Sequence, residues 1–497
     1  MNNETTHPYE LPKGWVWIRL GEITSVMSGG TPDTKDELNF GGDVVWITPA
    51  DLSGWDDKYI SHGARNITDR GLKSSSAVLL PKGSVIFSSR APIGYVAIAA
   101  TELCTNQGFK NFIPFDGLYN EYLYYYLKAS KSLAESFASG TTFSELSASR
   151  AANLPVPFPP TSEQHRIVAK IEELFTRLDA GVEALKKIKA QLKRYRQSIL
   201  KHAFEGKLTA EWRQAHKGEL EPASVLLDRI KGERRKSAKN RYKELPQVDT
   251  SELPELPEGW AWARVGEIYD IVGGGTPSTA IAEYWEGDTP WITSADIFGL
   301  RDIRPRRQIT RQAIENSATN LVPAGSLIVV TRVGLGKIAL TKTPICFSQD
   351  SQALVCGNTS LFPDYSLYCL SEGVQVFKYK HRGTTINGVT KKQLAELLFA
   401  VPPLTEQHRI VSEIERRFSV ADQIEKTVDQ SLKQAERLRQ SILKRAFEGK
   451  LVPRDPNDEP AEKLLERIRQ ERARQQAERK PAKSSRNKAN TKQMRLV

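Results

Sequence analysis

The sequence predicts a duplicated protein in which two mixed α/β domains alternate with long α-helices, in the order head, arm, head, arm. Residues 11–51 and 256–296 align without a gap at a constant offset of 245 residues. Farther along, the thirteen residues 196–208 recur at 439–451 with one change. The sequences between these anchors share little. A repeated scaffold with two divergent surfaces predicts a protein that holds two different targets in one geometry.

Each head opens with the motif GWxWxR(L/V)GEI, whose alternation of aromatic and other residues is typical of a β-strand. Further strands and a helical segment follow at matched places, which makes each head an α/β domain. These elements are expected at 44–48, 81–90 and 119–137 in the first copy and at 289–293, 323–332 and 365–380 in the second. The matched tryptophans are interpreted as core residues: Trp15 and Trp260, Trp17 and Trp262, and Trp46 and Trp291.

Each arm is predicted to be one long helix, at 163–205 and at 406–448. Apolar residues recur there about every 3.6 positions, which is the spacing of a helical stripe. Ser162 and Thr405 are the expected N-caps, and Gly206 and Gly449 stand at the expected C′ positions. Because a narrow apolar stripe needs a partner, we expect the two helices to pair as an antiparallel coiled coil with approximate two-fold symmetry.

The charge is concentrated on the arms. The chain has a net charge of +12, yet residues 1–155 carry −3 and residues 251–400 carry −1, whereas 156–250 and 401–497 carry +8 each. This distribution favours a polyanion as partner, with contacts from the heads made by local clusters. The predicted domains are the first head at 1–155, the first arm and linker at 156–250, the second head at 251–400, the second arm at 401–480 and a basic, disordered tail at 481–497.

The sequence gives no sign of a membrane segment, a metal site or a disulfide framework. The N-terminal residues are polar, and no apolar run is long enough to span a bilayer. The four cysteines form no CxxC pair, and the histidines show no ligand spacing. We therefore expect a cytoplasmic protein with reduced cysteines.

Catalytic motifs are nearly absent. The chain has no G-x-G-x-x-G, no phosphate-binding GxxxxGK[ST], no Asn/Asp-Pro-Pro-aromatic site and no GxSxG. Asp33, Asp56, Asp57 and Lys58 resemble the carboxylate–lysine pattern of metal-dependent nucleases, but Ser278 replaces Asp33 in the second head, which favours coincidence. Gly273–Gly275 is explained better by a tight turn than by a phosphate nest. We predict no catalytic, cofactor-binding or metal-binding residue in this chain.

Residues that read a DNA sequence are expected where the two copies differ, because a shared scaffold cannot distinguish two targets. For each of them the alternative is an ordinary solvated charge, and the arginines within 301–311 are the densest cluster. The candidates are Lys58, Arg65, Arg70 and Lys73 in the first head, and Arg301, Arg304, Arg306, Arg307, Arg311, Lys378, Lys380, His381 and Arg382 in the second.

Arg90 and Arg332 end matched strands and precede similar glycine-containing turns. Two interpretations stay open for this pair. The arginines either stabilise the turn or contact DNA phosphates, and residues common to both heads are not expected to read bases.

The head motifs, the SEQHRIV and TEQHRIV helix starts and the paired RQSILKxAFEGKL blocks together resemble one family. The chain is similar over nearly its whole length to the DNA-specificity subunits of type I restriction–modification systems. This resemblance implies two target-recognition domains held by antiparallel helices, each reading one half of a bipartite, asymmetric site in double-stranded DNA. It also implies assembly with two modification subunits that use S-adenosylmethionine and with restriction subunits that use ATP and Mg²⁺.

Two other function classes fit the sequence less well. A single-chain restriction–modification enzyme requires methyltransferase and nuclease motifs, which the sequence lacks. A coiled-coil structural protein without a nucleic-acid role does not explain why divergence is confined to surface-like stretches of the heads. The sequence therefore favours a non-catalytic DNA-binding subunit, and the bases it reads do not transfer from the family because the heads vary most in that respect.

Overall fold

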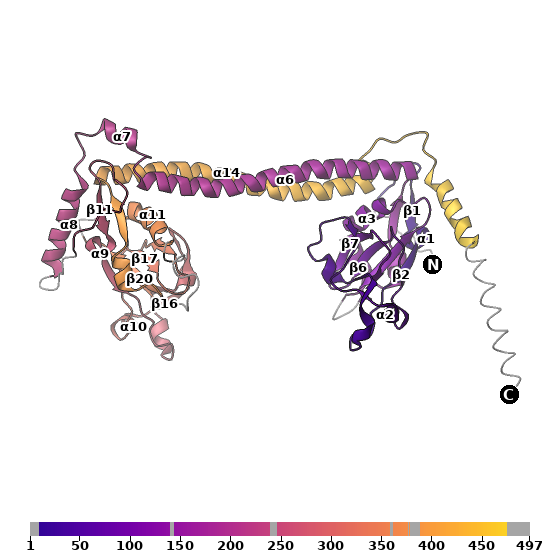
Figure 1. The fold of residues 1–497 in the computed structure, drawn as a ribbon, viewed down its shortest axis with the longest axis horizontal. Helices are drawn as coiled ribbons and strands as arrows, with labels where there is room; N and C mark the ends of the chain where they lie inside the picture. The colour runs from indigo at the N-terminus through magenta and orange to yellow at the C-terminus, as the bar shows by residue number, and fades with distance from the viewer. Residues whose placement is uncertain are drawn as a thin grey trace. The chain divides into compact units, whose positions relative to one another are not determined.

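The computed structural model describes residues 9–139, 144–238, 246–357, 361–375, 377 and 388–474. The chain forms two compact units, unit 1 (Met1–Leu185 and Gln430–Val497) and unit 2 (Lys186–Asp429). Each unit holds one α/β head and part of both long helices, α6 (Thr161–Phe204) and α14 (Leu404–Phe447), as Figure 1 shows by colour. The predicted fold class of α/β heads with long antiparallel helices is confirmed.

Head 1 is built on a five-stranded sheet of order β2-β9-β6-β7-β5. A second pair, β1 with β10, closes the head where it meets the arm, and the short parallel pair β4–β8 lies beside the sheet. Its strands are β1 (Val16–Arg19), β2 (Thr24–Ser28), β3 (Phe40–Val44), β4 (Trp46–Ile47), β5 (Tyr59–Ile60), β6 (Val85–Ser89), β7 (Ile93–Ala99), β8 (Cys104–Thr105), β9 (Phe109–Pro114) and β10 (Pro155–Phe158). Its helices are α1 (Leu20–Ile23), α2 (Asp69–Lys73), α3 (Asn120–Ala129), α4 (Lys131–Phe137) and α5 (Ala148–Ala152).

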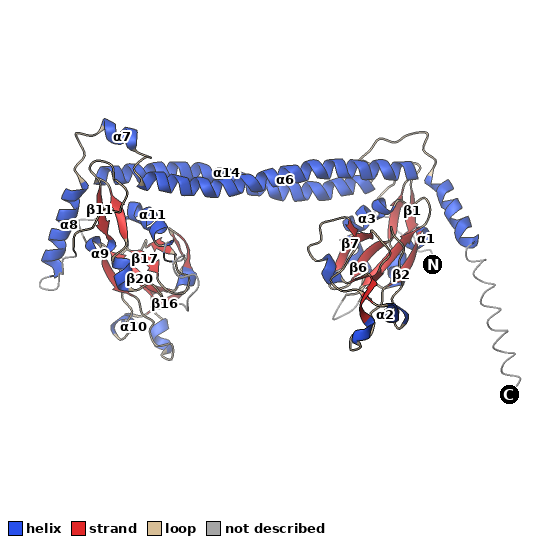
Figure 2. Ribbon diagram, in the orientation of Figure 1, coloured by secondary structure: helices blue, strands red, loops and turns tan. Residues whose placement is uncertain are grey.

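Head 2 repeats this plan with a four-stranded sheet of order β12-β20-β17-β18 (Figure 2). β11 pairs with β21 as β1 pairs with β10, and β13 pairs in parallel with β19 as β4 pairs with β8. Its strands are β11 (Ala261–Arg264), β12 (Asp270–Gly273), β13 (Thr289–Ile292), β14 (Ile297–Gly299), β15 (Asp302–Ile303), β16 (Arg307–Ile309), β17 (Leu327–Val330), β18 (Ile338–Leu340), β19 (Cys346–Phe347), β20 (Ser351–Val355) and β21 (Leu398–Val401). Its helices are α9 (Val265–Ile268), α10 (Arg311–Glu315), α11 (Pro363–Gly373) and α13 (Lys391–Ala395).

The matched tryptophans anchor equivalent turns. Trp46 and Trp291 are buried, and their indole N–H groups donate to the carbonyls of Gly30 and Gly275, each at 3.0 Å. A Cβ on Gly275 would lie 2.4 Å from the Ala318 carbonyl carbon, so the turn requires glycine. This close approach favours the tight-turn interpretation of the triple glycine. Trp15 and Trp260 are buried as well, whereas Trp17 and Trp262 are half-buried.

The EQH sequence at the start of each arm forms a joint between head and arm. In unit 1, Glu163 accepts a 2.9 Å hydrogen bond from the Trp15 indole, and Gln164 accepts the Tyr119 backbone N–H at 2.8 Å. The His165 ring lies against the Tyr119 ring, tilted by 32°, with the ring centroids 3.9 Å apart. Both Glu163 and Gln164 are buried, so this motif is explained by head–arm attachment.

Unit 2 has the same joint with a more complete set of partners for its carboxylate. Glu406 is fully buried and accepts from the Trp260 indole at 2.8 Å and from the Thr209 hydroxyl at 2.7 Å. It also forms a 2.7 Å ion pair with Arg213. Arg213 comes from α7 (Ala210–Ala215), in the connection that follows α6.

The two long helices pair antiparallel within each unit. In unit 2, Lys189 contacts Asp429 and Arg196 contacts Asp422, so seven steps forward on α6 match seven steps back on α14. In unit 1, Arg439 of α14 pairs with Asp179 of α6. Arg196 and Arg439 are the first residues of the two RQSIL blocks, so this repeated motif supplies the same cross-helix contact twice.

A helix that follows each arm in the sequence packs on the head of its own unit. In unit 2, α8 (Ala223–Ala238) buries Leu226 and Ile230 against head 2. In unit 1, the helix over 461–474 buries Leu464 and Ile468 against head 1. None of the described helices combines the length and the apolar character that crossing a membrane requires.

Three local expectations were wrong. Helices α6 and α14 begin at Thr161 and Leu404, so Ser162 and Thr405 lie inside the first turn and are not N-caps. The carbonyl of Pro160 already accepts the N–H of Gln164, which starts the helix earlier. The helix expected at 119–137 is two helices, because Ser130 leaves the helical conformation with φ −97° and ψ 17°.

The helix expected at 365–380 begins at Pro363, and α11 ends at Gly373. Residues 375 and 377 are again helical, and 376 and 378–380 lie outside the described residues. Gly206 and Gly449 have positive φ values of 70° and 66°, which confirms their predicted role after the helix ends. β10 ends at Phe158 and β21 at Val401, beyond the predicted head boundaries at 155 and 400.

We predict that Glu406→Ala destabilises the protein by about 3–5 kcal/mol, because it leaves the largely buried Arg213 without its counter-charge. Urea unfolding followed by tryptophan fluorescence measures this change. The matched control is Glu396→Ala, an exposed carboxylate 3.9 Å from Lys392, which should change the free energy by less than about 0.5 kcal/mol. Equal unfolding midpoints for the two variants would contradict the role given to the joint.

Candidate nucleic-acid interface

Two of the predicted DNA contacts, Lys58 and Arg301, lie against the arms. The Lys58 ammonium is 2.6 Å from Glu121 of α3 and also pairs with Glu172 of α6. Burial opposes its charge, but these two hydrogen-bonded carboxylates outweigh burial and raise the pKa of Lys58. Burial opposes ionisation of Glu121, but hydrogen bonds from Lys58 and Tyr59 lower its pKa. Lys58 therefore stays charged and is held between head and arm.

Arg301 occupies the equivalent place in unit 2. Its guanidinium lies 2.5 Å from Asp364 of α11 and 2.6 Å from Glu415 of α14. It also lies over the Tyr368 ring at 5.4 Å. The placement of Lys58 and Arg301 favours a structural role for both, and their contact with DNA bases stays a prediction.

The arginines that follow Arg301 are combined with aromatic side chains. Arg304 lies over the ring of Phe298 at 4.8 Å, and Phe298 is 61% exposed. Arg307, in β16, lies over the ring of Trp285 at 5.1 Å. Trp285 is half-buried, and Arg304 also pairs with Asp302 at 2.7 Å. Cation–ring pairs of this kind are preorganised to contact phosphates and base edges. We call Phe298, Trp285, Arg304 and Arg307 the arginine–aromatic patch.

Like Arg304, Arg306 and Arg311 pair with carboxylates. Arg306 pairs with the buried carboxylate of Asp296. Burial opposes ionisation of Asp296, but hydrogen bonds from the Thr293 backbone and from Arg306 lower its pKa. Arg306 thus contributes to local folding, whereas Arg311 is 91% exposed and pairs with Glu315 one turn along α10.

A surface cavity of about 770 Å³ adjoins this patch. It is open to solvent, and Figure 1 draws β16 and α10 at the end of head 2 away from α14. Its lining combines arginine, amide and hydroxyl groups with one indole ring, which suits contact with a nucleic acid. The lining residues are Thr279, Trp285, Pro290, Pro305, Arg306, Arg307 and Gln308.

The candidates of head 1 are more dispersed. Arg65 lies over the Phe40 ring at 3.5 Å, and Arg70 pairs with Asp36 at 2.7 Å. Arg70 and Lys73 belong to α2, which Figure 1 draws at the end of head 1 opposite α6. All three basic residues are exposed. Their contact with DNA stays a prediction.

The matched arginines after β6 and β17 differ in their surroundings. Arg90 lies 3.5 Å from Glu145, a carboxylate that Lys110 also approaches at 3.4 Å. Arg332 is exposed, and its side chain passes close to Gly388. A Cβ added to Gly388 would lie 2.5 Å from the Arg332 Cγ. Both interpretations of this pair, turn support and phosphate contact, stay open. Lys378, Lys380, His381 and Arg382 lie outside the described residues.

The carboxylate–lysine pattern of head 1 is not assembled into a site. Lys58 is directed to Glu121 and Glu172, while Asp33 accepts the backbone N–H of Lys35 in its own loop at 3.0 Å. Within the described ranges there is also no group of three His, Cys, Asp or Glu residues that could hold a metal ion. These placements agree with coincidence as the explanation of the pattern.

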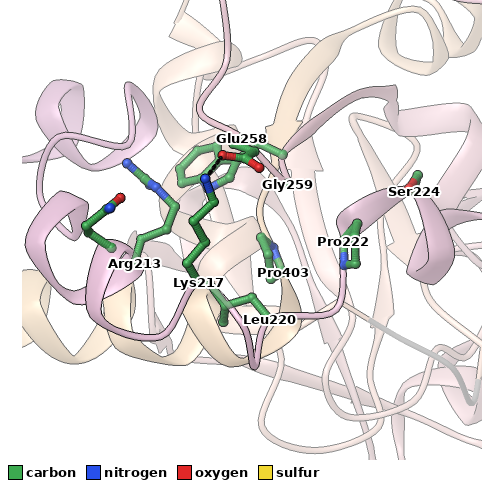
Figure 3. A pocket seen from close by; sticks show the side chains of 10 residues that line it. Arg213, Lys217, Leu220, Pro222, Ser224, Glu258, Gly259 and Pro403 are labelled. Atoms are coloured by element: carbon green, nitrogen blue, oxygen red, sulfur yellow. Dashed lines mark ion pairs between the residues drawn. The ribbon is translucent and has the colours of Figure 1, made fainter.

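A second cavity, of about 360 Å³, lies beside α7 in unit 2 (Figure 3). Lys217 and Glu258 face each other across it and form a 2.7 Å ion pair. Arg213, which lines the same cavity, holds the buried Glu406. Because these charges are paired with each other, the cavity is explained by the joint and offers little free charge to a ligand.

Sequence reasoning missed the aromatic half of the patch. Trp285 lies in the 3₁₀ helix Ala282–Trp285, outside the three matched tryptophan pairs. The sequence did offer a signal, because Trp285 has no matched tryptophan in the first copy and lies in a divergent segment that precedes the arginine cluster at 301–311. The equivalence of Lys58 and Arg301 was also missed, because the two residues differ in type and a difference in type indicates divergence.

Comparison with known proteins identifies the scaffold. Residues 12–194 and 257–434 each match the family model described as "Type I restriction modification DNA specificity domain". The MjaIX specificity subunit of Methanocaldococcus jannaschii is 29% identical over 79% of this chain and 84% of its own length. The EcoKI specificity subunit of Escherichia coli K12 is 24% identical over 93% of this chain and 97% of its own length.

Two solved structures share the fold. A chain from a structure of a type I restriction–modification system has a TM-score of 0.60 and 23% identity, covering 89% of this chain and 100% of its own. The HsdS subunit of Thermoanaerobacter tengcongensis has a TM-score of 0.55 and 22% identity, covering 89% of this chain and 99% of its own.

We predict that replacing Arg304 and Arg307 by Ala weakens DNA binding and flattens its salt dependence. Removal of one phosphate-binding cation should reduce the slope of log K against log salt by roughly 0.9. Arg306 is left intact so that Asp296 keeps its partner. Titrations of labelled duplex over a salt series measure the slope, with Arg416→Ala on α14 as the control. A slope equal to that of the unmodified protein would place the patch on a solvated face.

Proposed function

Because the chain belongs to the type I restriction–modification DNA specificity family, we propose that each head reads one half of a bipartite, asymmetric DNA site. Head 1 does so through the exposed basic surface around α2, and head 2 through the arginine–aromatic patch. The arms carry the modification subunits, and restriction subunits join the complex through them. The two half-sites differ because the two surfaces differ.

One observation carries this proposal. The two heads keep the same buried scaffold, in which the indoles of Trp46 and Trp291 donate hydrogen bonds to the carbonyls of equivalent glycines. The exposed ends of the heads differ in charge and aromatic content. A protein that bound a symmetric target would need two similar surfaces. The preserved core and the changed surface therefore support two different targets.

The proposal places all chemistry on partner subunits. The described residues assemble no metal cluster, and the basic residues of the heads are largely paired with carboxylates or rings. As the family resemblance implies, the proposal assigns S-adenosylmethionine, ATP and Mg²⁺ to the modification and restriction subunits, and this chain contributes recognition. Methylome sequencing of a host that carries the whole system tests the proposal, which requires a methylated site of two unlike halves around an unread gap.

We predict that the chain alone neither methylates nor cleaves DNA. Pure protein incubated with labelled S-adenosylmethionine and duplex DNA should transfer no methyl group, and transfer should appear when modification subunits are added. A control with modification subunits alone separates their basal activity from activity that depends on recognition. Methyl transfer by this chain without partners would overturn the assignment.

We predict that the arms act as a ruler for the gap between the half-sites. Seven residues added to both α6 and α14 at matching levels keep the apolar stripe within about 20° of its register. The added length is about 10 Å at 1.5 Å per residue, or about three base pairs at 3.4 Å per step.

Methylome sequencing of a host with the lengthened protein should show the same half-site bases and a longer gap. As a control, seven residues inserted into the surface loop after Gly218 should leave both the bases and the gap unchanged. Methylated sites with altered half-site bases and an unchanged gap would show that the arms are not the ruler.

A further inference from the structure

We propose that a charge cluster in each unit, which we call the head–arm lock, sets the angle of the head on its arm and so controls which gap length the protein accepts. The part of this inference that concerns DNA rests on the proposed function. Each lock is a head cation between a head carboxylate and an arm carboxylate. The members are Lys58, Glu121 and Glu172 in unit 1, and Arg301, Asp364 and Glu415 in unit 2.

The first argument is recurrence. Every member of the second lock stands 243 residues after its counterpart, the offset that also relates the two EQHRIV motifs. Lysine has become arginine and one glutamate has become aspartate, yet the charges and contacts are the same. Around Lys58 and Arg301 the two heads share little sequence, so retention of the positive charge without retention of residue type there indicates a constraint on the interaction itself.

The second argument is the aromatic support beneath each cation. The Lys58 ammonium lies 6.0 Å from the Tyr125 ring, and Arg301 lies 5.4 Å from the Tyr368 ring. Each tyrosine then meets an arm phenylalanine edge to face, at 5.9 Å in unit 1 and 6.0 Å in unit 2. The ring contacts therefore repeat together with the charges.

The third argument is the distance along the arm helix between the joint and the lock. The joint at Glu163 attaches head 1 at the start of α6, and Glu172 lies nine residues farther along, about 13.5 Å at 1.5 Å per residue. Ile167, Ile171 and Phe175 of α6 share the core of head 1, and an ionic attachment at that distance adds a directional restraint against rocking of the head about the joint. Glu415 stands at the same distance from Glu406 in unit 2.

Exposure of the arm carboxylates limits what the lock adds to the free energy of unfolding. The arm carboxylates Glu172 and Glu415 are 42% and 44% exposed, and exposed ion pairs add little to the free energy of unfolding. The head carboxylates are less exposed, at 12% for Glu121 and 22% for Asp364. The pair within each head is thus the firm part of the lock, and the contact to the arm is the adjustable part.

The test removes the arm contact alone. Glu172→Gln with Glu415→Gln leaves the Lys58–Glu121 and Arg301–Asp364 pairs intact, so both heads are expected to fold. The control is Glu173→Gln with Glu413→Gln, because the partners of these two carboxylates all lie on the arm helices. Glu172→Asp with Glu415→Asp restores the charge and should recover most of the original behaviour.

The first readout does not involve DNA. Spin labels introduced through unnatural amino acids at the exposed positions Lys73 and Ala180 report the distance between head 1 and its arm in the full-length chain. We expect the distance distribution of the lock variant to be at least twice as broad as that of the unmodified and control proteins. An unchanged distribution would overturn the lock.

The second readout is gap selectivity. DNA binding by the complex with modification subunits is measured on duplexes whose gap is the preferred length or one base pair longer or shorter. We expect the ratio of the affinity for the preferred gap to the affinity for the altered gaps to fall about fivefold in the lock variant. The same ratio should stay unchanged in the control. If the spin-label distance distribution broadens but the preference for one gap length is unchanged, the lock does not control the gap. Absence of DNA binding by the unmodified complex would overturn the proposed function, while the distance measurement still decides whether the lock holds the head.

Discussion

The structure depends on a buried carboxylate at the start of each long helix. The buried carboxylates of Glu163 and Glu406 accept the indole N–H groups of Trp15 and Trp260. The neighbouring Gln164 and Gln407 accept backbone N–H groups of the same head. A buried carboxylate is costly unless it is hydrogen-bonded, so its partners must be in place for the unit to be stable. This requirement ties the head strands to the helix and makes head and arm one unit.

The two joints are satisfied to different degrees. Glu406 receives the indole, a hydroxyl and the Arg213 guanidinium, and Arg213 comes from α7. In the part of unit 1 that the structure describes, the second carboxylate oxygen of Glu163 has no hydrogen-bond partner. Burial accordingly raises the pKa of Glu163, although the Trp15 hydrogen bond opposes the shift. Duplication of a fold has thus preserved the attachment while its electrostatic environment has changed.

The same division between a fixed interior and a changed exterior explains recognition. Turns that need glycine, indoles that donate to those turns and cross-helix arginines recur in both copies, because packing leaves them little freedom. Exposed ends of the heads carry no such constraint, and there Trp285 and Phe298 have been combined with arginines in one copy. Cations that hold a head to its arm belong to the fixed part even though they differ in residue type.

Periodicity and repetition in the sequence determined the fold class, the two long helices, the glycines that end them and the family. These features depend on local spacing, which a sequence displays directly. Tertiary structure decided which charges are free, because an ion pair joins residues that are distant in sequence. Lys58 and Arg301 have the sequence character of DNA-reading residues, and only the fold places Glu172 and Glu415 beside them. Helix starts at Thr161 and Leu404 were likewise decided by proline carbonyls that already accept helical N–H groups. The sequence could identify the arginine cluster of head 2, but the folded chain was needed to place Arg304 and Arg307 on aromatic rings and Arg306 on a buried aspartate.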